Sequence, residues 1–134
     1  MFTFEWPIRV RYAETDKMGY TYYGNYATYL EVARVEALRS LGISYKELED
    51  EGVMLPVLEY YIKYFKPAYY DEELLVHIKI NKRPDIRIEF EYEMYNKSGE
   101  KINFAQTTLV FVDVNTGKPT KPPFKVTQAF DQFF

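Results

Sequence analysis

Residues 11–26, RYAETDKMGYTYYGNY, decide how the rest of the chain can fold. They follow a segment at 4–13, FEWPIRVRYA, whose aromatic and β-branched residues are typical of a β-strand. They lead into residues 24–41, where apolar side chains recur at helical spacing. Gly19 and Gly24 let the backbone bend tightly between the two elements. The stretch therefore predicts a strand that turns directly into a long helix.

The chain after this turn predicts a long helix, a short helix and then strands. Gly42 ends the helix at 24–41, and its apolar positions are Tyr26, Tyr29, Leu30, Ala33, Ala37 and Leu41. A capping-box pattern runs from Ser44 to Glu47, and Gly52 ends the short helix that it begins. Four further strands are expected at 53–65, 74–81, 86–95 and 101–114.

The strand at 86–95 gives the clearest indication of the sheet. Its apolar residues alternate with charged ones and are Ile86, Ile88, Phe90, Tyr92 and Met94. This alternation is typical of an antiparallel strand with one solvated face. A curved antiparallel sheet of about five strands, wrapped around the long central helix at 24–41, would bury both apolar surfaces. We therefore expect one α+β domain over 1–134, and a 47% hydrophobic composition is ample for its core.

Composition excludes several classes of function. A formal net charge of −3 does not fit a generally basic nucleic-acid binder. The chain has no Cys, which removes disulfides and thiolate chemistry, and its single histidine, His77, fits neither a metal site nor a serine–histidine triad. No apolar run approaches the roughly 20 residues of a membrane span, and the N-terminus lacks a signal-peptide pattern. We expect a cytoplasmic protein without a metal or other cofactor.

Three stretches of the chain resemble one known family. They are the pattern D-x-x-G-x-x-Y-x-x-N-Y at Asp16–Tyr26, the helical YLEVARVE at 29–36, and LPVLEYYIKYFKPAYYDEEL at 55–74. Together they resemble the hotdog-fold acyl-CoA thioesterases of the 4-hydroxybenzoyl-CoA thioesterase family. The resemblance implies hydrolysis of acyl-CoA to a carboxylic acid and free CoA without a cofactor. It also implies a homodimer with sheets joined edge to edge, or a tetramer of two such dimers.

The resemblance also assigns candidate site residues. Asp16 matches the catalytic aspartate, and Tyr23 matches the position whose backbone N–H polarises the thioester carbonyl. The neighbouring candidates for substrate binding are Gly19, Gly24, Asn25 and Tyr26. Because CoA carries phosphates, cations near the ends of strands are further candidates, namely Lys63, Lys66 and Arg83. The start of a helix suits this chemistry, because its unpaired N–H groups hold the negative charge that develops on a carbonyl under attack.

Alternatives to these assignments stay open at the sequence level. Asp16 could instead cap the turn by accepting a backbone N–H bond from Met18 or Gly19. Glu14 is expected to be a solvated carboxylate at the end of a strand. The protein could also act on an acyl-carrier protein, or bind acyl thioesters without catalysis. Hotdog-fold hydratases pair the aspartate with a histidine five positions later, and Thr21 in that position argues against hydration.

Charged residues within the long helix are expected to form structural ion pairs. Glu31 lies three positions before Arg34, and Glu36 lies three positions before Arg39. This spacing places each pair on neighbouring positions of the helix surface. The pattern therefore favours intrahelical pairing over a catalytic role for either glutamate.

Overall fold

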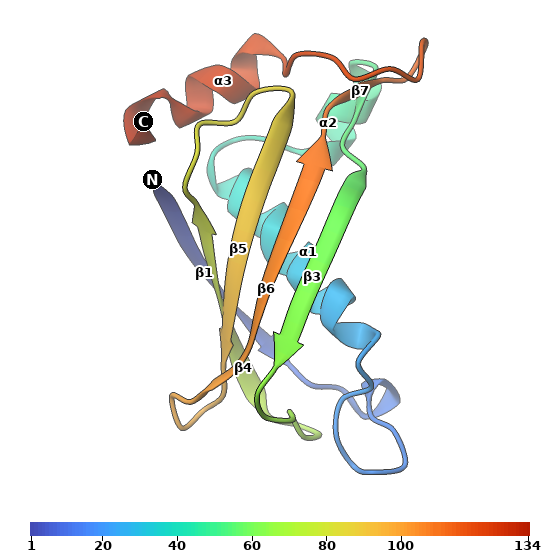
Figure 1. The fold of residues 1–134 in the computed structure, drawn as a ribbon, viewed down its shortest axis with the longest axis vertical. Coiled ribbons are helices and arrows are strands. Elements are labelled where there is room, and N and C mark those ends of the chain that lie inside the picture. The colour runs from blue at the N-terminus through green and yellow to red at the C-terminus, as the bar shows by residue number, and fades with distance from the viewer.

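Five strands form one antiparallel sheet in the order β1-β4-β5-β6-β3 (Figure 1). The computed structural model describes residues 1–134. The strands of this sheet are β1 (Phe2–Arg9), β3 (Val57–Tyr64), β4 (Glu73–Ile80), β5 (Arg87–Tyr95) and β6 (Lys101–Val110). The other elements are η1 (Tyr12–Glu14), α1 (Asn25–Ser40), α2 (Tyr45–Asp50), β2 (Val53–Met54), β7 (Val112–Asp113), α3 (Phe124–Phe130) and η2 (Asp131–Phe133). The predicted five-stranded antiparallel sheet is therefore confirmed.

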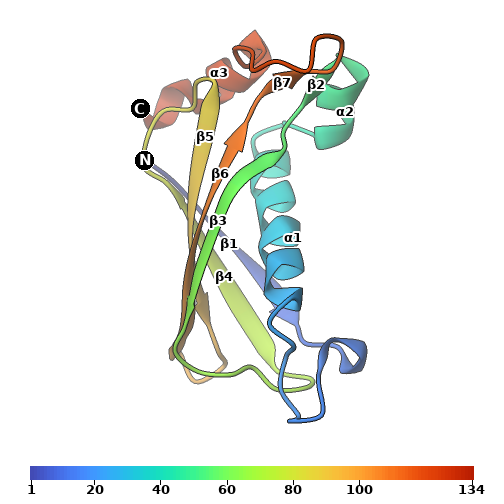
Figure 2. The same cartoon turned by 45° about the vertical axis from the view of Figure 1, so that its right-hand side comes forward.

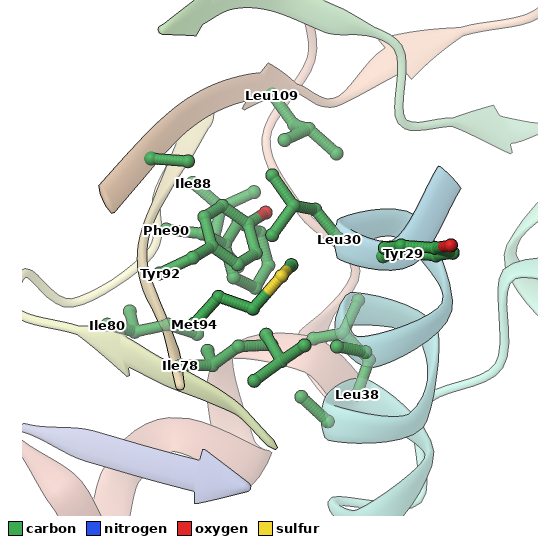
Figure 3. Packing of buried hydrophobic residues seen from close by; sticks show 14 of the residues in the cluster. Tyr29, Leu30, Leu38, Ile78, Ile80, Ile88, Phe90, Tyr92, Met94 and Leu109 are labelled. Atoms are coloured by element: carbon green, nitrogen blue, oxygen red, sulfur yellow. The ribbon is translucent and has the colours of Figure 1, made fainter. Parts of the chain in front are cut away.

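The core lies between α1 and one face of the sheet (Figure 2). In Figure 3, Leu30 and Leu38 of α1 point toward the apolar side chains of β4, β5 and β6. The sheet residues in this cluster include Ile78, Ile80, Ile88, Phe90, Tyr92, Met94 and Leu109. Alternation along β4 and β5 brings these side chains to the α1 face and leaves the charged residues on the other. The helix expected at 24–41 is α1, and its position is fixed by this burial.

Three of the expected strands differ in extent from the structure. The strand expected at 4–13 ends at Arg9, because residues 12–14 turn into η1. The segment 53–65 divides into β2 and β3, with Pro56 between them. The segment 101–114 likewise divides into β6 and β7, and β7 pairs with β2 in a separate two-stranded sheet. Proline and bends end each ladder earlier than the apolar pattern alone indicates.

The short helix and the tail differ in how well the sequence predicts them. The helix expected after Ser44 is α2, and the Ser44 hydroxyl accepts the backbone N–H of Glu47 at 3.5 Å. The tail after Gly117 is rich in proline, yet it forms α3 and η2. Val126 and Phe130 of α3 are buried against the end of the sheet, where Phe2 contacts Phe130 edge to face. Tertiary burial therefore stabilises a helix whose flanking prolines obscure it.

The two edges of the sheet have opposite characters. The β1 edge contains Pro7, which offers no N–H to a further strand, and charged residues at Glu5 and Arg9. The β3 edge has no proline inside it, and its exposed apolar residues are Val57, Leu58, Tyr60, Tyr61 and Tyr64. An unprotected apolar edge of this kind is suited to pairing with another chain. No helix of the protein is both long and apolar enough to cross a bilayer.

Candidate active site

The loop between η1 and α1 closes into a tight turn around Asp16. The Asp16 backbone N–H donates to Tyr20 O, and the Gly19 N–H donates to Asp16 O, each at 3.0 Å. Gly19 has a φ of 86°, a conformation that strains any residue with a side chain. The Asp16 Oδ1 atom accepts the Met18 N–H at 2.9 Å. The turn-capping bond foreseen for Asp16 is present, and Oδ2 accepts no bond from the chain.

The start of α1 presents backbone donors that the chain leaves unused. The Asn25 N–H donates to Tyr22 O at 2.9 Å, and the Tyr26 N–H donates to Tyr23 O at 3.3 Å. The N–H groups of Tyr23 and Gly24 donate to no group of the protein. Unpaired N–H groups at a helix N-terminus carry partial positive charge and can donate hydrogen bonds to an anionic oxygen. The helix start can therefore hold a carbonyl or an oxyanion.

A cavity of about 420 Å³ opens beside these groups. We call it the helix-start cavity, and it is lined by Asp16, Met18, Tyr20, Thr21, Tyr23, Tyr26, Tyr64, Phe65, Lys66 and Pro67. The structure thus brings Asp16 and Tyr23 together with two of the other predicted residues, Tyr26 and Lys66. A mainly aromatic wall with one carboxylate and one ammonium can hold an apolar group and orient a polar one.

The other predicted substrate-binding residues lie outside the lining of this cavity. Gly19 shapes the loop through its positive φ, whereas Gly24 has a helical φ of −63° and leaves room for the Tyr22 ring, which a Cβ would approach to 2.7 Å. The Asn25 side-chain amide donates to Glu14 O at 2.9 Å. Lys63 lies over the ring of Phe65, with its Nζ atom 5.8 Å from the ring centroid. None of these four residues lines the helix-start cavity.

Arg83 is remote from the helix-start cavity. It lies in the turn between β4 and β5, beside α3, at the opposite end of the sheet from the loop before α1 (Figure 1). There its guanidinium pairs with Asp131 and donates to Thr127 O. Lys66 lines the cavity but pairs with Glu100. Within one chain, Lys66 is the only predicted phosphate-binding cation that the fold brings to this cavity.

Glu14 is buried, and the expectation of a solvated carboxylate is wrong. Its Oε1 atom accepts the Tyr29 hydroxyl at 2.8 Å and the Arg11 N–H at 2.8 Å, and its Oε2 atom accepts the Arg11 guanidinium at 2.9 Å. Its backbone oxygen accepts the Asn25 amide and the Tyr22 N–H, each at 2.9 Å. Glu14 therefore joins the Asp16 loop to the first turns of α1. The sequence shows an acidic residue directly before the loop, but it does not show that this residue bonds to Arg11 and Tyr29.

The charge state of Glu14 follows from these bonds. Burial raises the pKa of Glu14, but hydrogen bonds from Arg11 and Tyr29 together outweigh it and lower the pKa below its ordinary value of 4.5. Burial also raises the pKa of Tyr29, and its hydrogen bond to Glu14 raises that pKa further, so the phenol stays protonated. Glu14 is ionised at neutral pH and accepts bonds from both elements.

Arg34 does not form the expected pair with Glu31. Its Nε–H donates to the Tyr45 hydroxyl and its Nη1–H donates to the Tyr92 hydroxyl, each at 3.1 Å. Its position four residues after Leu30, in the buried row of α1, is the signal that it faces the sheet. The other expected pair is confirmed, because Arg39 Nε lies 3.3 Å from Glu36 Oε1.

Comparison with known proteins identifies the family of this chain. The family model described as the thioesterase-like superfamily matches residues 10–130. The chain belongs to this superfamily. It is 38% identical over 112 residues to a Bacillus subtilis protein named putative acyl-CoA thioesterase YneP, covering 84% of this chain and 81% of that one. It is 31% identical over 129 residues to the Escherichia coli acyl-CoA thioester hydrolase YbgC, covering 96% of each chain.

A solved structure supports the same assignment for this member of the thioesterase-like superfamily. The DHNA-CoA thioesterase from Staphylococcus aureus superposes with a TM-score of 0.86 at 36% identity, covering 100% of this chain and 85% of that one. A 1,4-dihydroxy-2-naphthoyl-CoA thioesterase from Synechocystis superposes with a TM-score of 0.91 at 25% identity, covering 98% of each. The hotdog-fold thioesterases are therefore structural neighbours of this chain over its whole length.

The role of Glu14 can be tested through the pH dependence of stability. Its folded-state pKa is lowered, so its ionised form stabilises the fold above the unfolded-state pKa, and this stabilisation is lost as pH falls through the folded-state value. We expect Glu14→Gln to lower the free energy of unfolding by about 1–3 kcal/mol at neutral pH. Urea titrations should show the difference from the unmodified protein narrowing as pH falls below 4.5.

Glu36→Gln is the matched control, because Glu36 forms an exposed pair with Arg39. It should change the free energy of unfolding by no more than about 0.5 kcal/mol. Equal losses in the two variants, or a Glu14→Gln difference that stays constant with pH, would contradict the assignment.

Proposed function

We propose that this protein is an acyl-CoA thioesterase that hydrolyses acyl-CoA to a carboxylic acid and free CoA. The observation that carries the proposal is that Asp16 and Tyr23, whose backbone N–H is unpaired, line the same cavity. Membership of the thioesterase-like superfamily and the names of its relatives support the same reaction. The proposal includes one domain in which the sheet curves around α1 as a central helix.

In this mechanism the substrate carbonyl lies at the start of α1. The thioester oxygen accepts the Tyr23 N–H, and as the carbonyl carbon becomes tetrahedral that oxygen gains negative charge. The hydrogen bond and the positive end of the helix then bind it more tightly than they bound the ground state. One donor of this kind contributes about 3–4 kcal/mol to the stabilisation of the transition state. Because the donor is a backbone group, the phenol of Tyr23 is not required for this step.

Asp16 supplies the second element of the mechanism. Its Oδ1 atom is held by the Met18 N–H, while Oδ2 is free to approach the carbonyl carbon or a water molecule. In direct attack, an Asp16 oxygen bonds to the acyl carbon, the carbon–sulfur bond breaks, and CoA leaves as a thiolate that takes up a proton. Water then cleaves the mixed anhydride and regenerates the carboxylate. In the alternative route, Asp16 takes a proton from a water molecule as that water attacks the carbonyl carbon. The carbon–sulfur bond then breaks and releases CoA.

Binding of the CoA portion falls to the rim of the cavity. Lys66 lines the cavity and Lys63 lies near the end of β3, three residues before it, so we propose both as contacts for the phosphates. Lys66 shares its charge with Glu100, which a phosphate would have to displace. Arg83, at the far end of the sheet, has no part in this proposal within the same chain.

The edge of β3 supports assembly into a homodimer. Its exposed apolar side chains and unprotected backbone would be covered by the same strand of a second copy. Tyr64 belongs both to this strand and to the helix-start cavity, so pairing at β3 would place the cavity near the boundary between subunits. A tetramer of two such dimers is the larger assembly that we propose.

Light scattering tests this assembly. We expect a mass at least twice the 16.0 kDa of one chain at micromolar concentration. Replacing Leu58 and Tyr61 together by lysine should yield monomers, because charges on an edge strand oppose pairing. Val114→Lys, at an exposed apolar residue away from β3, is the control and should leave the mass unchanged. A stable monomeric form of the unmodified protein with full activity would overturn the dimer.

Asp16→Asn separates catalysis from turn capping. The amide oxygen of asparagine can still accept the Met18 N–H, so the turn is preserved while the charge and most of the nucleophilicity are lost. We expect kcat for thiol release from acyl-CoA to fall at least about 100-fold, with little change in the affinity for a non-hydrolysable analogue. Near-native turnover in this variant would instead show that Asp16 is only a cap.

Single-turnover hydrolysis in oxygen-18 water distinguishes the two routes for Asp16. If Asp16 attacks the acyl carbon and water then attacks the Asp16 carbonyl of the anhydride, label enters the carboxylate of Asp16. Mass spectrometry of the peptide that contains residue 16 detects this label. Label found solely in the product acid would show that water attacks the acyl carbon, either in the thioester or in the anhydride, and would give no support to a covalent route in which water attacks the Asp16 carbonyl.

A further inference from the structure

Arg34 is a buried cation with no carboxylate partner. The residue is only 6% exposed, and its guanidinium donates to two phenols, those of Tyr45 and Tyr92. Burial lowers the pKa of Arg34, but the phenol oxygens of Tyr92 and Tyr45 outweigh it and raise the pKa, so the charge is retained. Buried charges in proteins are normally paired. This one lacks a counter-charge within the chain.

Arg34 keeps donors that the chain leaves unused, and the residue lines a cavity. Nη2 donates to no group of the chain. It is not fully buried, because the side-chain polar atoms that are both fully buried and without a partner are Thr21 Oγ1 and Asn103 Oδ1. Arg34 lines a cavity of about 250 Å³ between α1 and β3, which we call the seam cavity. Its other lining residues are Ala27, Leu30, Glu31, Val57, Tyr60 and Thr107. The cavity is mainly apolar, with a charged donor on its wall.

The seam cavity follows the helix-start cavity along the same two elements. Tyr26 of α1 and Tyr64 of β3 line the helix-start cavity, whereas Leu30 and Tyr60, one helical turn and four strand residues away, line the seam cavity. From Tyr26 to Arg34, α1 rises roughly 12 Å at 1.5 Å per residue. An acyl chain that starts at the helix N-terminus and follows this seam would end beside Arg34.

Two tyrosine rings on the wall of the helix-start cavity lie next to each other, one from α1 and one from β3. The centroids of Tyr26 and Tyr64 are 5.4 Å apart. Tyr26 is buried, but Tyr64 is 44% exposed at the edge of the sheet. Rotation of the Tyr64 ring would open the seam to a chain.

We infer that the seam cavity binds the far end of the acyl group, and that Arg34 selects acyl groups whose far end carries an oxygen acceptor. The inference rests on the proposed function, since it takes the ligand to be the acyl group of a thioester. Nη2 would donate to a hydroxyl or carboxylate oxygen at the end of the chain, which would give the buried guanidinium a third hydrogen-bond partner. Arg34 is thus assigned as a specificity-determining residue.

Glu31 influences whether a hydroxyl or a carboxylate at the end of the acyl chain is preferred. It lines the same cavity and is exposed, without an ion pair to Arg34. Its carboxylate would repel a second carboxylate but accept a bond from a hydroxyl that itself accepts from Arg34. A terminal hydroxyl satisfies both residues, whereas a terminal carboxylate satisfies Arg34 alone. Comparing the two ends measures the influence of Glu31.

Binding of non-hydrolysable thioether analogues of CoA tests the inference. The analogues carry saturated chains from hexyl to dodecyl that end in a methyl, a hydroxyl or a carboxylate group. An apolar cavity without a donor disfavours a polar end. We expect the unmodified protein to bind a polar-ended chain about 10- to 100-fold more tightly than the methyl-ended chain of the same length, within a limited range of lengths.

The variants Arg34→Met and Arg39→Met assign the preference to one side chain. Arg34→Met should abolish it, while Arg39→Met, the same change at an exposed position of α1, should leave it intact. Retention of the preference in Arg34→Met would overturn the role of Arg34. If Arg34→Met does not fold, the comparison of chain ends in the unmodified protein still decides, and tighter binding of methyl-ended chains at every length overturns the inference.

Thiol release from octanoyl-CoA by the unmodified protein tests the proposed function separately. If octanoyl-CoA is hydrolysed but the three chain ends bind equally well, the inference about the seam cavity is wrong and the proposed function stands. A clear binding preference without hydrolysis of any acyl-CoA would contradict the proposed catalysis and leave the binding site in place.

Discussion

The hydrogen bonds that converge on Glu14 hold the sheet, the loop and the helix in one arrangement. Arg11 follows β1, Tyr29 lies in α1, and both donate to the same carboxylate. The backbone oxygen of Glu14 accepts from Asn25 as well, at the first residue of α1. A carboxylate that lost one of these donors would be left partly unsatisfied in a buried place, which proteins tolerate poorly. The loop that carries Asp16 is therefore fixed relative to the start of the helix.

The chemistry proposed for the site depends on that fixed relation. A backbone donor and a carboxylate act together on one carbonyl only if their separation is set before the substrate arrives. Tyr23 is placed by α1, and Asp16 is placed by the turn that Gly19 permits. Glu14 links the two placements without lining the cavity. This division explains why a buried acid can lie two residues from the proposed catalytic one and yet serve a different purpose.

The polar groups along α1 show how the sequence pattern is overridden by packing. Glu36 and Arg39 pair as their spacing predicts, because both are near the surface. Arg34 has the same spacing from Glu31 but belongs to the row of α1 that faces the sheet, so it meets Tyr45 and Tyr92 instead. Helical spacing states which side chains are neighbours on a helix. It does not state which neighbour another element will supply.

The sequence by itself determined the strand–turn–helix order, the extent of α1, the alternation in β4 and β5, and the position of Asp16 and Tyr23 between strand and helix. These features follow from local periodicity, glycine and capping, which act over a few residues. The tertiary structure alone decided the burial of Glu14, the partners of Arg34, the helix α3 and the remote place of Arg83. Each of these depends on contacts between segments far apart in the chain, and neither spacing nor composition specifies such contacts.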